Sequence, residues 1–196
     1  MAKYKRRDGT LVPETDPMHL ITPHMVPDRC DNEAVLTELF DMTAVEAYLA
    51  KKNADGPEFK YTFFHVICAA IAKVLVLRPR MNRFYAGRRL YDRNDILFAF
   101  VVKKKFEDNG AEALAIIKVD KDGEISPVEQ LHGKVKDIVY SVRKENKTEG
   151  TTEKMGILTK LPRGLLRLVM SFLNWLDYHG KYPAALMKDD PYFASV

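Results

Sequence analysis

Cysteine is scarce in this chain of 196 residues, which contains only Cys30 and Cys68. Two cysteines are too few for the disulfide framework of a small secreted domain. Cys68 also lies in an apolar segment, where a free thiol packs as a small hydrophobic group. We therefore expect both thiols to be reduced and structural.

Long apolar runs and targeting segments are missing as well. The chain has no run of about 18 apolar residues, which a transmembrane helix requires. The basic stretch from Met1 to Gly9 lacks the apolar core of a secretory signal. These absences predict a cytoplasmic protein.

The composition is that of an ordinary soluble globular protein, with 46% hydrophobic and 30% charged residues. Its length favours one domain with a full core. A net charge of +4 suits an anionic ligand without identifying one, because charge bears on partners rather than on fold.

Residues 1–33 are polar and rich in proline, and no periodic pattern runs through them. We interpret them as an extended N-terminal arm with little regular structure, preceding a domain that spans residues 34–196. His19 and His24 lie in this arm. Because no cluster of cysteine or carboxylate ligands accompanies them, we predict surface imidazoles and no metal site.

The segment from Thr62 to Leu77 is apolar on nearly every side over the length of a helix, which is typical of a buried helix. Thr62 is placed to cap this helix. Arg78-Pro79 should end it, because proline restricts the residue before it and has no amide hydrogen. After a turn, residues 88–91 and 95–103 are predicted strands, the second too apolar on both faces for a sheet edge.

The segments on either side predict further strands and helices. Ala34 to Phe40 is predicted as a strand, followed by a helix that Thr43 and Glu46 would open as a capping box. Ala113 to Val119 is predicted as the second strand of an antiparallel hairpin. Ser126-Pro127 opens a helix whose apolar stripe should lie on the sheet.

The last long apolar segment, Leu161 to Tyr178, follows a charged stretch at 145–154 that we predict to be a surface loop. The polar positions of this segment form a narrow strip, which leaves a broad apolar surface around Trp175. Such a cationic helix is compatible with a membrane interface, but we favour packing within the domain or against another subunit. Gly180 should end the helix, and Tyr192 to Val196 is predicted to begin a strand.

Part of this pattern resembles a known family. The residues that carry the resemblance are the alanine-rich buried helix, the segment Arg78-Pro79-Arg80-Met81-Asn82-Arg83-Phe84, and Asp95-Ile96 at the start of a strand. They look like the catalytic (acyltransferase) domain of 2-oxo acid dehydrogenase E2 components, in the chloramphenicol acetyltransferase-like superfamily. Leu36 to Leu49 is similar to that domain's first core strand and first helix, and the likeness extends from Ile21 to Val142.

The resemblance implies a fold, a reaction and an assembly. The fold would be an α/β (α+β) two-layer sandwich, chloramphenicol acetyltransferase-like, with a mixed sheet, helices on one face and an incomplete C-terminal part. The reaction would transfer an acyl group between coenzyme A and a thiol or hydroxyl acceptor. The site would lie between the subunits of a homo-trimer, so the implied partners are acyl-CoA and further copies of this chain.

The catalytic residues of the family have no counterpart here. Its base is the histidine of a His-x-x-x-Asp-Gly motif, and the residues at that place before the Asp-Gly pairs of this chain are Tyr4, Lys51 and Lys118. The family's Ser-Asn-Leu-Gly strand and any lipoyl-type motif are also absent. We therefore assign no catalytic residue, expect the chain to be inactive alone, and interpret it as truncated or degenerate. His65 is expected to be packed rather than catalytic.

The residues proposed to bind coenzyme A are Arg78, Arg80 and Arg83, because guanidinium groups bind phosphates through paired, charge-assisted hydrogen bonds. The same arginines suit a solvated turn between strands, and the sequence leaves both interpretations open. No aromatic ladder or groove-reading motif accompanies them, so we do not expect nucleic acid as a partner. The alternative function is a non-catalytic assembly or partner-binding protein that retains the fold.

Overall fold

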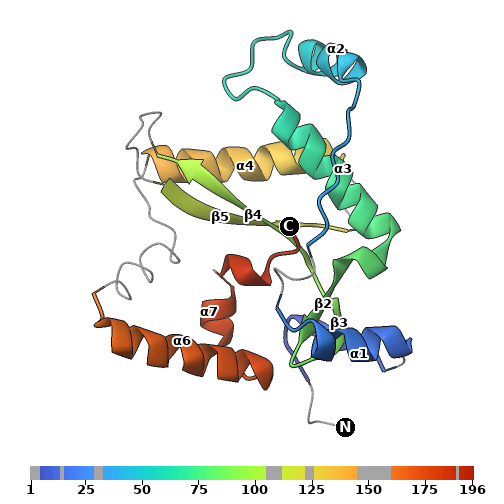
Figure 1. The fold of residues 1–196 in the computed structure, drawn as a ribbon. Coiled ribbons are helices and arrows are strands. Elements are labelled where there is room, and N and C mark those ends of the chain that lie inside the picture. The colour runs from blue at the N-terminus through green and yellow to red at the C-terminus, as the bar shows by residue number, and fades with distance from the viewer. Residues whose placement is uncertain are drawn as a thin grey trace.

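The computed structural model describes residues 5–13, 16–28, 33–104, 112–121, 126–144, 160–188 and 190–196 (Figure 1). Its helices are α1 (Pro17–Met25), α2 (Thr43–Lys52), α3 (Phe63–Leu77), α4 (Pro127–Lys144), α6 (Arg163–Tyr178) and α7 (Ala184–Met187). Its strands are β1 (Gly9–Leu11), β2 (Arg83–Ala86), β3 (Arg89–Arg93), β4 (Ile96–Lys103) and β5 (Glu112–Val119). Within the described ranges, 3₁₀ turns lie at Pro79–Asn82 and Pro191–Phe193.

The described strands form two small sheets. One has the order β1-β3-β2, and the other is the hairpin of β4 and β5, in which Ile96 lies opposite Val119. The protein is therefore α+β, as predicted. The predicted mixed sheet is wrong for the described residues, because every strand pairing among them is antiparallel.

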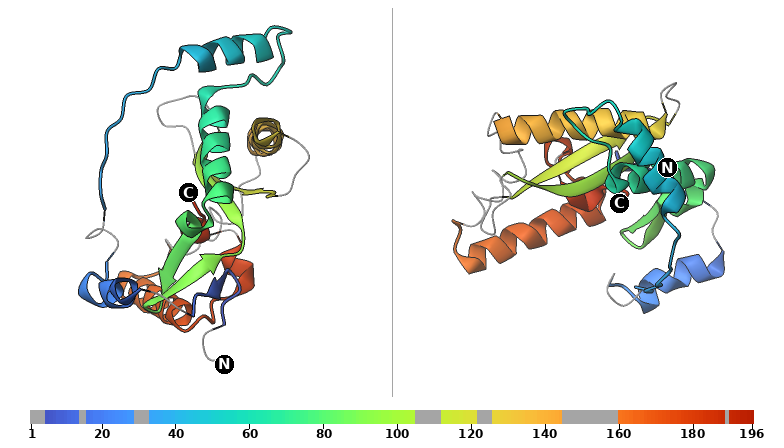
Figure 2. Two further views of the ribbon diagram at one scale, coloured as in Figure 1. Left: turned by 90° about the vertical axis from the view of Figure 1, so that its right-hand side faces the viewer. Right: turned by 90° about the horizontal axis from the view of Figure 1, so that it is seen from above.

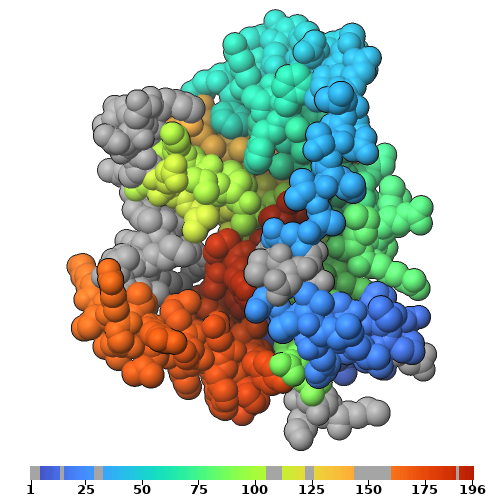
Figure 3. Space-filling view, in the orientation of Figure 1, coloured from blue at the N-terminus to red at the C-terminus, as the bar shows by residue number. Residues whose placement is uncertain are grey.

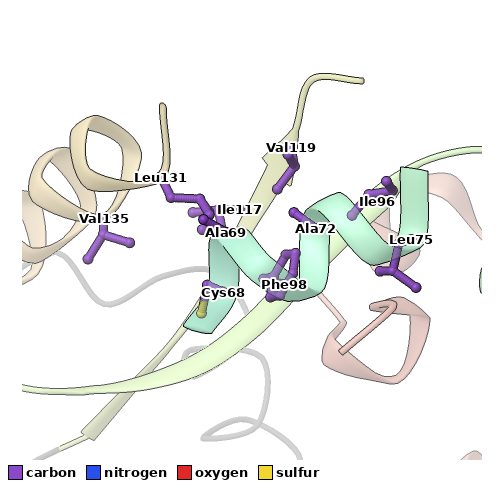
Figure 4. Close-up of a cluster of buried hydrophobic side chains, with 10 residues drawn as sticks. All are labelled: Cys68, Ala69, Ala72, Leu75, Ile96, Phe98, Ile117, Val119, Leu131 and Val135. Carbon is purple, nitrogen blue, oxygen red and sulfur yellow. The ribbon is translucent and has the colours of Figure 1, made fainter. Parts of the chain in front are cut away.

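Helices α3 and α4 pack on the same face of the β4–β5 hairpin, as Figure 4 shows. The buried side chains are Ile96 and Phe98 of β4, Ile117 and Val119 of β5, Cys68, Ala69, Ala72 and Leu75 of α3, and Leu131 and Val135 of α4. Small residues on α3 allow this helix to approach the strands closely. The helix itself, its end at Arg78 and the packing of α4 on the sheet are confirmed. The prediction that this helix is buried on nearly every side is wrong, because Ile67, Val74 and Leu77 on its other side are 42–65% exposed.

The exposed edge of β4 departs from the sequence prediction. Among the described residues β5 alone pairs with β4 as a strand, so the prediction that β4 is too apolar for an edge is wrong. The C-terminal residues cover part of this edge, since the Ser195 N–H donates to the Leu97 carbonyl (2.7 Å) and the Ala99 N–H donates to the Val196 carbonyl (2.8 Å). The predicted start of a strand at Tyr192 is instead a 3₁₀ turn followed by these bonds.

The hairpin of β2 and β3 turns at Gly87 and Arg88, which both have positive φ angles (54° and 59°). Positive φ at both positions is the geometry of the two-residue turn that fits the twist of paired strands. A Cβ atom on Gly87 would lie 2.5 Å from the Tyr178 carbonyl oxygen, so glycine is needed where α6 ends. The sequence predicted a turn here and missed β2.

The N-terminal region is more regular than the predicted extended arm. β1 pairs with β3, and α1 begins at Pro17 behind Asp16, whose carboxylate accepts a hydrogen bond from the Met18 N–H (2.9 Å). Proline fits the first turn of a helix, where its missing N–H costs nothing. The prediction of little regular structure in residues 1–33 is therefore wrong for their described part.

Residues 33–40 run along the outside of the molecule between α1 and α2 (Figure 2). The predicted strand at Ala34–Phe40 is wrong, because this segment pairs with no described strand. Its large apolar side chains are 78–98% exposed: Val35, Leu36, Leu39 and Phe40. The capping box predicted from Thr43 and Glu46 is also wrong, since Asp41 accepts hydrogen bonds from the N–H (2.9 Å) and hydroxyl (2.6 Å) of Thr43.

Outside the described residues lie Cys30, the charged stretch at 145–154, and residues 108–110, where the sequence Asp-Asn-Gly predicts the turn of the hairpin that ends in the strand 113–119. The helix predicted at Leu161–Tyr178 and its end at Gly180 (φ 68°) are confirmed by α6. A search of the described helices for one of sufficient length and apolar character to cross a membrane finds none.

Candidate functional site

Of the three arginines proposed to bind coenzyme A, Arg83 already has a carboxylate partner. Its Nε donates to Asp92 Oδ1 (2.6 Å), and Asp92 lies directly opposite it on β3. Arg78, at the C-terminal end of α3, and Arg80, in the 3₁₀ turn, are exposed and form no ion pair with a described residue. Arg78 and Arg80 are therefore available to a ligand, whereas Arg83 stabilises the hairpin.

Three further arginines that follow in the sequence contact different groups. Arg88 Nη1 lies 3.3 Å from His24 Nδ1, Arg89 Nη1 donates to the Gly87 carbonyl, and the Arg93 guanidinium lies over the Phe84 ring. Burial lowers the pKa of Arg93. These three side chains have structural contacts around the β2–β3 hairpin and do not extend the candidate site.

Apolar side chains flank the two available arginines. Leu77 and Met81 are each 65% exposed, so the five residues from Leu77 to Met81 offer two cations and two apolar groups at the surface. The C-terminal end of a helix carries negative partial charge and does not favour an anion. Arg78 and Arg80 must therefore supply the attraction for any phosphate bound here.

Asn82 fixes the turn that carries these residues. Its side chain is buried, and Nδ2 donates to the Asp95 carbonyl (3.0 Å) where β4 begins. An asparagine amide suits this place because a buried carbonyl without a donor is costly. Asn82 thus has a role in the fold.

A second group of polar atoms lies at the N-terminal end of α3 around His65, which is only 2% exposed. His65 Nδ1 accepts a hydrogen bond from the Thr62 N–H (3.0 Å), the role that glutamate or glutamine has in a capping box. The neutral ring then carries its proton on Nε2, which has no hydrogen-bond partner among the described residues. The surrounding rings, 5.1–6.3 Å away between centroids, are Phe59, Tyr61, Phe64 and His132.

The packed position predicted for His65 is confirmed, and we expect it to give the protein a measurable sensitivity to acid. Burial, followed by the charge on His132, lowers the pKa of His65. Its contribution to stability is thus present above the ordinary histidine pKa of about 6.5 and is lost as the pH falls through the folded-state value. In urea titrations, the free energy of unfolding should therefore fall more steeply on acidification for the wild-type chain than for His65→Gln.

Glutamine is the matched control because it keeps the acceptor for the Thr62 N–H and does not titrate. The difference between the two unfolding free energies, followed from about pH 7.5 to about pH 5, isolates His65 from the other titrating groups. Curves that stay parallel over this range would show that the ring takes up a proton as easily in the folded chain as in the unfolded one.

Other candidate groups offer no reactive site. Cys68 is a buried free cysteine, as predicted, and burial raises the pKa of its thiol, which disfavours the nucleophilic thiolate. His19 and His24 are exposed, as predicted. Across the described ranges, no group of three or more histidine, cysteine, aspartate or glutamate side chains is placed to hold a metal ion.

The sequence missed a buried ionic network around Arg6. Arg6 donates to both carboxylate oxygens of Asp8 (2.9 Å each) and to the side chain (2.6 Å) and carbonyl (2.7 Å) of Asp177. Burial alone would lower the pKa of Arg6, but hydrogen bonds to the two aspartates raise it above its ordinary value. The network joins the N-terminal segment to the end of α6. Because Arg6 and Asp177 are 171 residues apart in the sequence, no local sequence pattern predicts their contact.

Comparison with known proteins finds no match to this chain among protein-family models, curated proteins or solved structures.

Proposed function

We propose that this chain is a CoA-dependent acyltransferase-like domain of the 2-oxo acid dehydrogenase E2 type, assembling as a homo-trimer. The observation that supports it is the exposed pair Arg78 and Arg80 beside the exposed side chains of Leu77 and Met81. Coenzyme A combines phosphate groups with a less polar pantetheine arm, so it needs both kinds of contact. The order of α3, 3₁₀ turn and strands agrees with the segment on which the sequence resemblance depends.

We assign ligand binding to this surface and no catalytic residue. The buried His65 is held by its cap hydrogen bond and has no exposed nitrogen with which to take a proton from a thiol. We accordingly expect no release of free coenzyme A from acetyl-CoA by this chain alone.

Binding of coenzyme A should depend on the two arginines. Hydrogen bonds between charged groups contribute about 1.5–3 kcal/mol each, so Arg78→Ala with Arg80→Ala should weaken binding by about a hundredfold or more. Isothermal titration calorimetry with coenzyme A measures this loss. Pantetheine, which lacks the phosphates, should bind both chains equally.

The matched control is Arg7→Ala, which removes an exposed arginine far along the chain from the site. It should leave the affinity for coenzyme A unchanged. No detectable binding of coenzyme A at millimolar concentration, or equal affinity in the double variant, would rule out this surface as the coenzyme A site.

A second function, non-catalytic assembly, is favoured by apolar side chains that the single chain leaves exposed. Besides residues 33–40, these include Met18, Leu20 and Met25 of α1, which are 59–72% exposed. Apolar surface of this extent is typical of interaction sites. A chain that binds neither coenzyme A nor pantetheine yet elutes as an oligomer would support this second function over the first.

A further inference from the structure

Helix α6 is attached to the molecule mainly at its C-terminal end. Arg6 binds the side chain and carbonyl of Asp177 there, and the Tyr178 carbonyl lies against Gly87. No residue of α6 is fully buried, although the half-buried side chains Leu166, Val169, Leu173 and Leu176 mark the side toward the molecule. Figure 3 shows α6 at the surface in orange. The outer side of this helix is therefore open to a partner.

The outer side carries a narrow apolar row, which we call the α6 seam. It consists of Leu165 (47% exposed), Leu168 (67%), Phe172 (58%) and Trp175 (50%). The rings of Phe172 and Trp175 stack with their centroids 6.1 Å apart. The steps of three, four and three residues are those of the contact positions of a coiled coil, which face another helix.

The position of the cations distinguishes a helix partner from a lipid surface. At 3.6 residues per turn, Arg163 and Arg167 lie roughly 120–160° around the helix from the middle of the seam. A helix on an anionic membrane has its cations beside the inserted apolar face, where they reach the headgroups. These arginines point away from the seam, so the geometry favours a second helix.

The seam is complementary to itself when a second copy runs antiparallel. The steps of three, four and three residues are the same in both chain directions. An antiparallel pair therefore places Leu165 opposite Trp175 and Leu168 opposite Phe172. Each contact then joins a ring to an aliphatic side chain, whereas a parallel pair would place Trp175 against Trp175.

We propose that two copies of this chain associate through their α6 seams, antiparallel and about a twofold axis midway between Leu168 and Phe172. Small residues on one flank, Gly164 and Ser171, allow the two helices to approach closely. A closed twofold contact of this kind uses the same surface on both copies. This inference is independent of the proposed function, because pairing through α6 requires neither coenzyme A nor a threefold contact.

Light scattering of the full chain tests the pairing. Phe172→Glu places a charge in the seam and should halve the particle mass, whether the paired unit is a monomer or a trimer. Asn174→Glu adds the same charge on the polar side and should leave the mass unchanged. Circular dichroism checks that both variants stay folded. If the Phe172→Glu variant has the same particle mass as the wild-type chain, the proposal is overturned.

Cross-linking tests the antiparallel direction in a chain with Cys30→Ser and Cys68→Ala. Ser171→Cys lies near the twofold axis and should be joined to its counterpart by a short bis-maleimide. Gly164→Cys should react several-fold less, because the two copies of residue 164 are separated by about twelve residues, roughly 18 Å along the helix axis. Equal yields at both positions, or binding of the chain to anionic vesicles as a monomer, would contradict the proposed pair.

Discussion

Replacing Arg6 with alanine is expected to lower the free energy of unfolding by about 3–5 kcal/mol, a loss typical of removing one member of a buried ion pair. The side chains of Arg6, Asp8 and Asp177 are only 3%, 7% and 14% exposed. Without the guanidinium, two carboxylates would stay in this environment with no cation between them. Urea unfolding followed by circular dichroism measures the effect.

Arg7→Ala is the matched control, because Arg7 is the exposed neighbour of Arg6 and lies outside the network. A surface substitution of this kind changes stability by about 0.5 kcal/mol or less. Arg6→Lys should fall between the two, since lysine keeps the charge but cannot bind Asp8 through two parallel hydrogen bonds. Similar midpoints for Arg6→Ala and Arg7→Ala would show that the network contributes no net stability.

The elements that the sequence predicted correctly are those with local causes. The apolar surface of residues 62–77 and the Arg78-Pro79 stop define α3, and Ser126-Pro127 defines the start of α4. Each signal depends on residues within one or two turns of each other, and local hydrogen bonds and side-chain spacing decide the outcome. Such elements form in the structure where the pattern places them.

The wrong predictions concern elements that need a distant partner. Residues 34–40 have strand-forming side chains, but a strand is stable only when another strand pairs with it, and the described chain supplies none. The helix α1 shows the opposite error, because repeated prolines suggested an irregular arm. Pro17 occupies the first turn, where proline is tolerated, and Asp16 supplies the cap.

The sequence predicted which arginines belong to the candidate site, but not which of them forms an ion pair. Arg78, Arg80 and Arg83 looked equivalent in sequence, yet Arg83 binds Asp92 because the unpredicted β2 places them opposite each other. His132 meets the His65 cluster only because α4 packs beside α3. Contacts of this kind follow from tertiary structure, and no spacing in the sequence indicates them.

The contact of α4 with α3 and the hairpin supports the second large prediction. Leu131 has no exposed surface and lies in the cluster between these elements. Leu131→Ala should lower the free energy of unfolding by about 2–5 kcal/mol, because the lost burial is accompanied by a cavity in a packed core. The loss should appear as a lower urea midpoint at an unchanged slope.

Leu77→Ala makes the same chemical change at a position that is 65% exposed on the same core helix. It leaves no cavity, so its cost should stay within about 0.5 kcal/mol. Equal losses at the two positions would mean that Leu77 is covered in solution or that α4 is only loosely packed on the sheet. Measuring both variants across a range of protein concentrations separates these explanations, because covering by a second copy makes the Leu77 loss depend on concentration.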